Sequence, residues 1–247
     1  MLFRAVVAVV PVVVAQAAVA QPIPPLPPPR PAETPPVTPP AARPQAPPVP
    51  TADAPPAIPE ADDCLARLQA AGFDLEPAEP PQVSNELCRI ETPVRLKAVP
   101  VPTKSETAVR LTDQPTLACR FAGPFGHWIG DLVAPLVAGI KGTELRAVRT
   151  GPGFECRNRN RAAAGKLSAH AQGLAIDIAG FDLANGTTLR IKPEADTAPD
   201  PALAALRTAA CGWFTTILGP GSDEAHHDHL HVDIEQHGSS DRYRICQ

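Results

Sequence analysis

The sequence predicts an α+β domain, a small antiparallel sheet with flanking helices, preceded by a disordered proline-rich segment. Three observations support this fold class. Helix-like and strand-like patterns follow one another irregularly after residue 61, which favours an α+β fold over a doubly wound parallel sheet. More than half of the 33 prolines lie between residues 22 and 60, a stretch without helical or strand periodicity. All of the 6 cysteines follow that stretch.

Residues 1–20 have the pattern of a secretory signal peptide. Arg4 precedes a short apolar run that ends in small residues, so we expect cleavage after Ala20. Pro11 interrupts the run, which is shorter than the roughly 20 residues that span a bilayer, and this argues against a stable membrane anchor. Gln21 rather than Cys occupies the first mature position, which gives no site for lipid attachment. We therefore expect an exported protein of the periplasm or cell envelope.

Residues 21–61 form the proline-rich linker, and residues 62–247 form the folded domain. The linker is expected to be an extended, semi-stiff polyproline II segment that either holds the domain away from its origin or acts as a plain solvated spacer. The formal net charge of -4 excludes binding to nucleic acid or anionic lipid by bulk electrostatic attraction. A small substrate or a neutral polymer fits this charge better. The sequence leaves the oligomeric state open.

The cysteines of the domain predict three disulfides. An even number of cysteines in an exported chain is typical of disulfide pairing. A structural metal site would need closely spaced cysteine pairs, and the sequence contains no CxxC pair. The pairing among them stays open; they are Cys64, Cys88, Cys119, Cys156, Cys211 and Cys246.

The first elements of the domain are a short helix and two strands. Residues 62–72 begin with two aspartates that can cap a helix, carry Leu65 and Leu68 on one face, and stop at a glycine. Residues 94–99 and 144–149 alternate between apolar and polar positions and are predicted strands.

A second helix is predicted between those two strands, over residues 127–140. Pro135 is expected to kink it, because proline cannot donate a backbone hydrogen bond inside a helix. Its apolar residues recur at helical spacing. They are Trp128, Leu132, Leu136 and Ile140.

The remaining elements form a hairpin, a helix and a last strand. Asn185-Gly186 separates the apolar run Gly173–Phe181 from the alternating Thr187–Lys192, which is a strong hairpin signal. Asp200-Pro201 is typical of the N-cap and first turn of a helix. The apolar face of that helix contains Leu203, Leu206 and Ala210, and the last predicted strand is Leu230–Glu235.

The main functional signal is a concentration of histidines. Five of the 7 lie within residues 168–177 and 226–233. Zinc binds imidazole nitrogen and carboxylate oxygen, and a catalytic zinc site usually takes three protein ligands and leaves the fourth position to water. His170, Asp177 and His231 would provide such a set.

Strand geometry supports this choice. Alternate residues of a strand face the same side, so His229, His231 and Asp233 are expected to project together, with His227 facing away. His170, just before the strand that contains Asp177, reaches the same point if that strand and the strand of His231 are adjacent, and Gly173 would let backbone or substrate approach closely.

Other polar residues near these segments are given ordinary roles. His127 and His237 stand alone and are predicted to be surface or core-edge histidines. Asp228 and Asp233 are predicted to orient imidazoles rather than to bind metal. Asp182 is predicted to be a turn residue.

The domain also resembles a known family. The pattern Ser168-x-His170-x-x-Gly173-x-Ala175-x-Asp177, followed far downstream by His229-x-His231, is similar to the zinc D-Ala-D-Ala carboxypeptidases and murein endopeptidases. Their fold group includes lysostaphin-type peptidases and the hedgehog signalling domain. A longer resemblance, over residues 62–247, is to the bacterial extensin-like C-terminal domain. It also includes Cys156-Arg157-Asn158-Arg159, Ala210-Cys211, Leu218-Gly219-Pro220-Gly221 and Ala225-His226-x-Asp228-His229.

The resemblance implies a hedgehog/D-Ala-D-Ala-peptidase-like fold and a zinc metallopeptidase that acts on the peptide stems of peptidoglycan. His229 would take a proton from the zinc-activated water or stabilise the oxyanion, with help from His226. Some relatives use a Glu shortly before the last His, but Glu224 does not have that spacing.

The resemblance also implies a substrate-binding group. It consists of Ser168 and an arginine, either Arg157 or Arg159, that would bind a substrate carboxylate through two hydrogen bonds.

Two alternatives to the peptidase stay open. One is a non-catalytic, zinc-containing module that binds the cell wall or a partner, and the other is a structural proline-rich wall protein.

Overall fold

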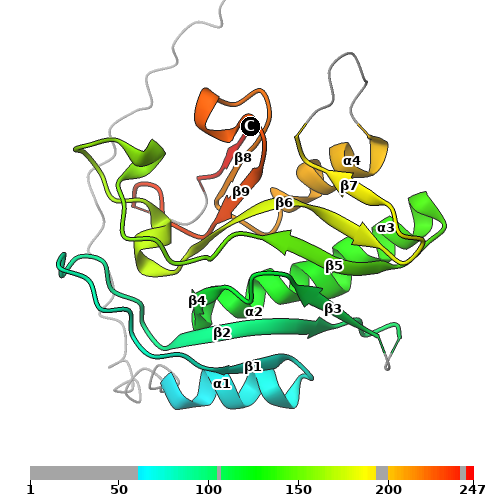
Figure 1. The fold of residues 1–247 in the computed structure, drawn as a ribbon, viewed down its shortest axis with the longest axis horizontal. Coiled ribbons are helices and arrows are strands. Elements are labelled where there is room, and N and C mark those ends of the chain that lie inside the picture. Colours follow the sequence, from blue (N-terminus) through cyan, green and yellow to red (C-terminus); the bar gives the residue numbers. More distant parts are fainter. Residues whose placement is uncertain (1–60, 105–106, 193–199, 240–242) are drawn as a thin grey trace, which may run out of the picture. The chain divides into compact units, whose positions relative to one another are not determined.

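The computed structural model describes residues 61–104, 107–192, 200–239 and 243–247. The predicted signal peptide and nearly all of the predicted linker lie outside these residues. The described residues contain helices and a mixed sheet, which confirms the α+β class (Figure 1). No helix among them is both long and apolar enough to cross a membrane.

The sheet is larger than predicted and is not purely antiparallel. Within the described residues it has ten strands, in the order β1-β2-β3-β5-β6-β9-β8-β10, with β4 beside β2 and β7 beside β6 (Figure 1). The strands are β1 (Asp74–Pro77), β2 (Pro93–Pro100), β3 (Ala108–Leu111), β4 (Thr116–Ala118), β5 (Leu145–Thr150), β6 (Ala175–Leu183), β7 (Thr188–Arg190), β8 (Thr216–Leu218), β9 (Leu230–Asp233) and β10 (Ile245–Cys246).

Two strand pairs are parallel, namely β3 with β5 and β8 with β10. Parallel neighbours need a long crossover connection, and for β3 and β5 the helical segment between them provides it. The prediction of a purely antiparallel sheet was wrong. Strand β3 is too short to be recognised from its sequence pattern, so its parallel pairing with β5 could not be predicted. The predicted strands 94–99 and 144–149 correspond to β2 and β5.

The first helix, α1 (Ala61–Ala70), is confirmed but begins one residue earlier than predicted. Its aspartates therefore lie inside the first turn rather than at the cap. Asp63 pairs with Arg67 one turn later at 2.8 Å, an arrangement that stabilises an exposed helix modestly. Gly72 follows the helix with a φ of +87°.

The helix predicted over residues 127–140 is part of a longer one. It consists of α2 (Cys119–His127), a π-helical turn η1 (Trp128–Val133) and α3 (Ala134–Lys141). Ala134 donates its N–H to the carbonyl of Ile129, five residues earlier. The irregularity predicted at Pro135 is thus a π-helical turn that directly precedes it.

This π-helical turn rotates the buried face of the helix. Of the four residues predicted to form the buried face, only Trp128 is fully buried. Ile140 is 49% exposed, and Leu132 and Leu136 are half-buried. The π-helical turn places one extra residue between successive buried positions. Val133 and Val137 are buried instead.

The later elements agree with the sequence signals. Helix α4 (Pro201–Ala210) is capped by Asp200, whose carboxylate accepts the N–H of Ala202 at 2.9 Å. The hairpin of β6 and β7 turns at Asn185-Gly186. Strand β9 ends at Asp233, two residues before the predicted end. Asp182 lies in β6 rather than in the turn, where its carboxylate accepts hydrogen bonds from Arg149 and Thr188.

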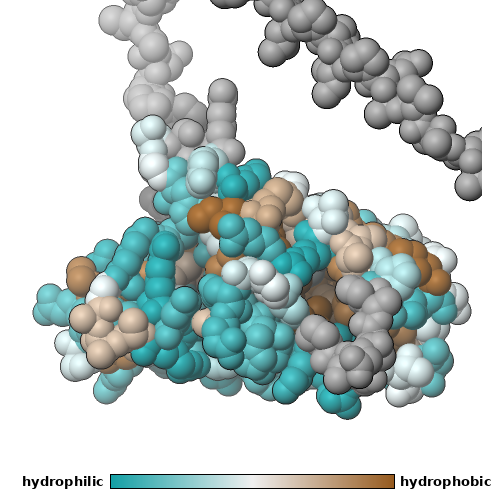
Figure 2. Space-filling view, turned by 90° about the horizontal axis from the view of Figure 1, so that it is seen from above, coloured by the Kyte–Doolittle hydropathy of each residue, from teal (hydrophilic) through white to brown (hydrophobic). Residues whose placement is uncertain are grey.

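The core lies between the sheet and the helices. Helix α2 packs on β2, α3 packs on β5 and α4, and α1 packs on β1 and α2. Aromatic side chains fill the centre of this layer, and they are Phe121, Phe125, Trp128 and Phe214. The molecular surface seen in Figure 2 is mostly hydrophilic, with separated hydrophobic areas rather than one continuous patch.

The three predicted disulfides are confirmed, and the structure shows how the cysteines pair. Cys64 in α1 joins Cys119 at the start of α2. The two further bonds are Cys88–Cys156, which joins the segment before β2 to the segment after β5, and Cys211–Cys246, which joins the end of α4 to β10.

Candidate metal centre

Asp177 and His231 stand opposite each other on neighbouring strands. They are direct partners in the antiparallel pairing of β6 and β9. Successive side chains of a strand point to opposite faces, so their buried neighbours Ile176 and Val232 face the core while Asp177 and His231 project from the other face. Asp177 Oδ1 lies 2.9 Å from His231 Nδ1.

A tight turn presents His170. The residue lies in the 3-10 turn η3 (Ala169–Gln172), and the hydroxyl of Ser168 accepts its backbone N–H at 3.4 Å. Gly173 ends the turn with a φ of +65°, which glycine adopts without strain. A Cβ there would lie 2.8 Å from the nitrogen of Ala118 in β4, whose N–H donates to the Gly173 carbonyl at 2.9 Å. The close approach predicted at Gly173 is therefore made by backbone.

Three ligand atoms converge from these elements. His170 Nε2 lies 3.2 Å from both Asp177 Oδ1 and His231 Nδ1. The two histidines are 2% and 7% exposed, whereas 25% of the Asp177 side chain is exposed, so the group is reached by solvent from the Asp177 side. The group formed by His170, Asp177 and His231 could hold a metal ion.

Each of the two histidines has an inner ring nitrogen, which faces the other candidate ligands, and an outer ring nitrogen, which faces away from them. The hydrogen bond of the outer nitrogen decides whether the inner nitrogen can bind a metal ion. His170 Nδ1 lies 2.6 Å from the carbonyl oxygen of Gly153, and His231 Nε2 lies 3.1 Å from Asp233 Oδ2. Both oxygens only accept hydrogen bonds, so each of these nitrogens donates its N–H. In the neutral imidazoles the inner nitrogens then carry lone pairs that face each other and Asp177. Three acceptors this close are stabilised by a cation between them.

The pKa values of these groups reflect the same convergence. Burial alone would lower the pKa of His231, but hydrogen bonds to Asp177 and Asp233 outweigh it and raise that pKa to about 9. Burial would raise the pKa of Asp177, yet the hydrogen bonds and charges of His170 and His231 hold it far below its usual range. The site therefore stabilises positive charge strongly.

His229 and His226 flank this group. His229 donates Nδ1–H to Asp228 at 2.9 Å, and its Nε2 lies 3.5 Å from Asp177 Oδ1. Its side chain is 23% exposed and can therefore meet a solvent-borne molecule. His226 is buried and donates Nδ1–H to Asp223 at 2.6 Å. Burial lowers the pKa of His226, and the hydrogen bond to Asp223 offsets only part of that effect.

The two candidate arginines differ in their surroundings. Arg157 donates Nε–H to Glu155 at 2.7 Å, and its Nη2 lies 3.6 Å from Asp177 Oδ2. Arg159 pairs with Glu235 at 2.9 Å and is more exposed. Of the two, Arg157 is the arginine beside a candidate ligand, and both already have carboxylate partners.

A small cavity of about 100 Å³ adjoins the site. Most of the predicted polar residues meet at its wall. They include Arg157, Arg159, Ser168, His226, His231 and Asp233. His237 also lines it, half-buried and with Nε2 2.7 Å from the Thr216 hydroxyl, which agrees with the predicted core-edge position.

The other predicted positions lie outside the group. His227 faces away, with 55% of its side chain exposed and its Nδ1–H donated to the carbonyl of Glu224 at 2.8 Å. His127 is exposed and lies 3.2 Å from Asp131. The role of Gly153 was not predicted, because its contact with His170 is made by a backbone carbonyl, which every residue type has.

A comparison with known families assigns most of the chain. The family model described as extensin-like protein C-terminus matches residues 62–247, a range that contains the three candidate ligands and every cysteine. No curated protein and no solved structure matches the chain. Because the model covers well over half of the sequence, the chain belongs to the extensin-like protein C-terminus family.

Proposed function

We propose that this protein is an exported zinc metallopeptidase that hydrolyses peptide bonds in peptidoglycan stems. One observation carries the proposal. Three potential ligand atoms, His170 Nε2, Asp177 Oδ1 and His231 Nδ1, converge beside a partly exposed histidine, His229. The substrate class is supported by the resemblance of the ligand pattern to zinc D-Ala-D-Ala carboxypeptidases and murein endopeptidases.

Zinc fits the donor set. Two imidazole nitrogens and one carboxylate oxygen are typical of catalytic zinc sites, which leave a further position for water or substrate. Zinc bonds of about 2.0–2.1 Å in tetrahedral geometry separate neighbouring ligand atoms by about 3.3 Å. The three separations here, 2.9, 3.2 and 3.2 Å, are close to that value.

The residues around the ligands would divide the work of hydrolysis. A zinc ion supplies Lewis acidity, which polarises a carbonyl and lowers the pKa of water. His229 is the general base. Its Nδ1–H donates a hydrogen bond to Asp228, so the lone pair is on Nε2, which faces Asp177. His226, whose ring centre lies 5.3 Å from that of His229, assists by donating or accepting a proton at Nε2.

Export is supported by the disulfides. Three disulfides are typical of proteins that fold in an oxidising compartment such as the periplasm. The predicted signal peptide and proline-rich linker agree with a place in the cell envelope, where peptidoglycan is the abundant polymer.

One observation favours the non-catalytic alternative, a zinc-containing module that binds the wall or a partner. Arg157 and Arg159 each donate a hydrogen bond to a carboxylate of the protein, Glu155 and Glu235, so part of the charge of each guanidinium is already neutralised before a substrate carboxylate arrives. Such a module would retain zinc and bind wall peptides without cleaving them.

The experiment is incubation of the full exported chain with muropeptides, with and without zinc, followed by mass spectrometry of the products. We expect zinc-dependent cleavage. His229→Ala should abolish turnover and leave the bound zinc nearly unchanged, whereas His231→Ala should lose the zinc. Zinc binding without any product would favour the wall-binding module. Full metal content in both variants would mean that the ligand set is wrong.

A further inference from the structure

One buried carboxylate, Asp233, holds the His231 ring nitrogen that points away from the other candidate ligands. Asp233 is 4% exposed and accepts Nε2–H of His231 on Oδ2. Its other oxygen, Oδ1, accepts the backbone N–H of Glu235 at 2.9 Å. It also shares the hydroxyl of Thr215, at 3.2 Å, with the backbone carbonyl of Asp233, at 3.1 Å. Both oxygens are thus held from different sides, which fixes the plane of the carboxylate and with it the imidazole.

Thr215 connects this carboxylate to the edge of the sheet. It directly precedes β8, it is buried, and its backbone N–H donates to the carbonyl of Asp233 at 2.9 Å. On its other side, its carbonyl accepts the N–H of Ile245 in β10 at 2.8 Å. Thr215 therefore lies between the strand that carries the ligand and the C-terminal strand.

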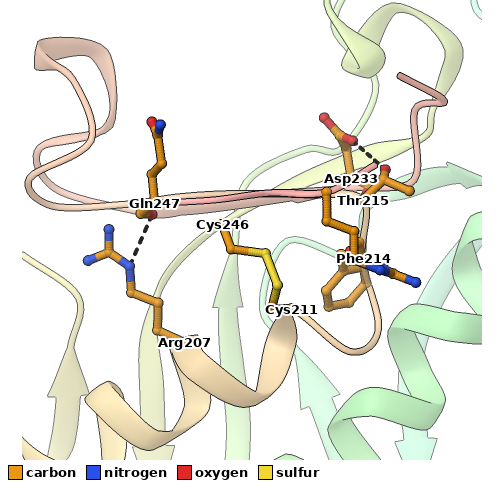
Figure 3. The surroundings of a disulfide bond; sticks show 8 residues. Arg207, Cys211, Phe214, Thr215, Asp233, Cys246 and Gln247 are labelled. Atoms are coloured by element: carbon orange, nitrogen blue, oxygen red, sulfur yellow. Dashed lines mark hydrogen bonds between the residues drawn. A yellow bond between two sulfur atoms is a disulfide. The ribbon is translucent and has the colours of Figure 1, made fainter. Parts of the chain in front are cut away.

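The C-terminal strand needs more than its pairing to stay in place. Strand β10 has two residues, and so short a strand is marginal by itself. The Cys211–Cys246 disulfide ties it to the end of α4, and Arg207 of α4 donates to the carbonyl of Gln247 at 3.1 Å (Figure 3). A further hydrogen bond joins Arg244 to the carbonyl of Phe214.

Figure 3 shows these contacts on two sides of the sheet edge. The disulfide points toward α4, and Asp233 with Thr215 lies on the opposite side. His231 projects to the same side as Asp233, because the two residues alternate on strand β9. The two sides are joined by the backbone of the segment that runs from Cys211 into β8. An anchor on the helix side thereby restrains the carboxylate on the metal side.

We propose that the disulfide-anchored C-terminal strand positions the ligand His231 through Thr215 and Asp233, and that the affinity for metal depends on this chain of contacts. Thr215 is a positioning residue, since its hydroxyl contacts Asp233 and is not one of the three candidate ligands. The inference rests on the metal site of the proposed function but not on peptidase activity, because metal affinity can be measured alone.

The first test measures the zinc dissociation constant of the full chain by competition with a chromophoric chelator. Thr215→Val keeps the shape of the side chain and removes the hydroxyl. We expect the affinity for zinc to fall about 10-fold, the lower end of the loss for a direct partner of a ligand histidine, because Thr215 acts through Asp233. Thr215→Ser should restore affinity to within about 2-fold of wild type. Thr208→Val is the matched control, because among the described residues the Thr208 hydroxyl bonds only the Ala204 carbonyl of its own helix.

The second test removes the anchor. Cys211→Ser with Cys246→Ser should weaken zinc binding by several-fold, on the order of the Thr215→Val effect. Cys64→Ser with Cys119→Ser removes a disulfide between α1 and α2 and should leave the zinc affinity of the folded protein unchanged. Circular dichroism checks that each variant is folded before titration.

The outcomes separate the two proposals. A wild-type chain that binds no zinc overturns the metal site and this inference together. A wild-type chain that binds zinc, with Thr215→Val equal to it or with Thr215→Ser as weak as Thr215→Val, overturns the positioning role alone. Because the Thr215 variants keep all three disulfides, they decide the question even if the cysteine variants do not fold.

Discussion

The two histidine ligands are held by different means. His170 sits in a 3-10 turn, and the atom that fixes its ring is the backbone carbonyl of Gly153. His231 sits in a strand, and the group that fixes its ring is the side chain of Asp233. One ligand therefore depends on the path of the backbone and the other on a chain of side chains.

This difference has a consequence for mutation. A backbone carbonyl is present whatever residue occupies position 153, so the His170 side responds mainly to changes that move the main chain. The carboxylate of Asp233 can be removed by one substitution that leaves the main chain in place. Stability and metal affinity should therefore change together on the His170 side and separately on the His231 side.

The largest expected effect is on the His170 side, from Gly173→Ala. The new Cβ would meet the Ala118 nitrogen at 2.8 Å in a backbone conformation with a φ of +65°. We expect a loss of about 3 kcal/mol in unfolding free energy, measured by urea denaturation, together with loss of zinc. Gly186→Ala is the control, since that glycine has a φ of +85° but no atom within 4 Å of the new Cβ, and should cost only about 1 kcal/mol. Equal losses in the two variants would contradict the close contact.

The next effect is on the His231 side, from Asp233→Asn. Loss of the charged acceptor should weaken zinc binding by about 10- to 100-fold, measured by chelator competition. Asp228→Asn removes a carboxylate that orients His229 rather than a ligand, and should leave zinc affinity unchanged. If both variants bind zinc as tightly as wild type, Asp233 does not orient the ligand.

A smaller effect concerns pH. In the metal-free protein the pKa of His231 is raised from 6.5 to about 9, so His231 is protonated at pH 7.5. The protonated form stabilises the fold, and this contribution to the unfolding free energy is complete below pH 6.5 and is lost as the pH rises through 9. A metal ion takes the same nitrogen, so binding at pH 7.5 should release close to one proton from His231. Calorimetric titration in buffers of different ionisation enthalpy measures that number. Zinc binding without proton release would contradict the raised pKa.

The smallest effect should come from Ser168→Ala. The hydroxyl accepts the backbone N–H of His170 at 3.4 Å, and its loss should cost about 0.5–1 kcal/mol of stability. Zinc affinity should change by less than about 3-fold, because the Gly153 carbonyl still holds the ring. A large loss of substrate turnover at nearly constant zinc affinity would instead support the substrate-binding role predicted for Ser168.

Local signals predicted the elements that local interactions stabilise. Asp200 caps its helix through its own side chain, and Asn185-Gly186 allows the turn of the hairpin. The strands that were missed have two to four residues, such as β4 and β10, and they exist because distant segments pair with them. A pattern of so few residues carries no usable periodicity.

The candidate site divides in the same way. His170, Asp177 and His231 could be proposed from residue type, because few side chains bind metal and these lie in segments rich in histidine. The groups that orient them could be proposed only in part. Asp233 was visible as an alternate residue on the strand of His231, but Thr215 is one of many threonines, and its position beside Asp233 follows from the pairing of β8 and β9.

The pattern of disulfides determines what a protease cut would do to the domain. Residues 82–87 and 162–165 are exposed loop positions, where proteolytic nicking is favoured. A nick at 82–87 leaves the pieces joined covalently through Cys64–Cys119. A nick at 162–165 leaves no disulfide between them, because Cys88–Cys156 lies wholly before it and Cys211–Cys246 wholly after it. The second piece would then carry all three ligands without the carbonyl of Gly153 that orients one of them.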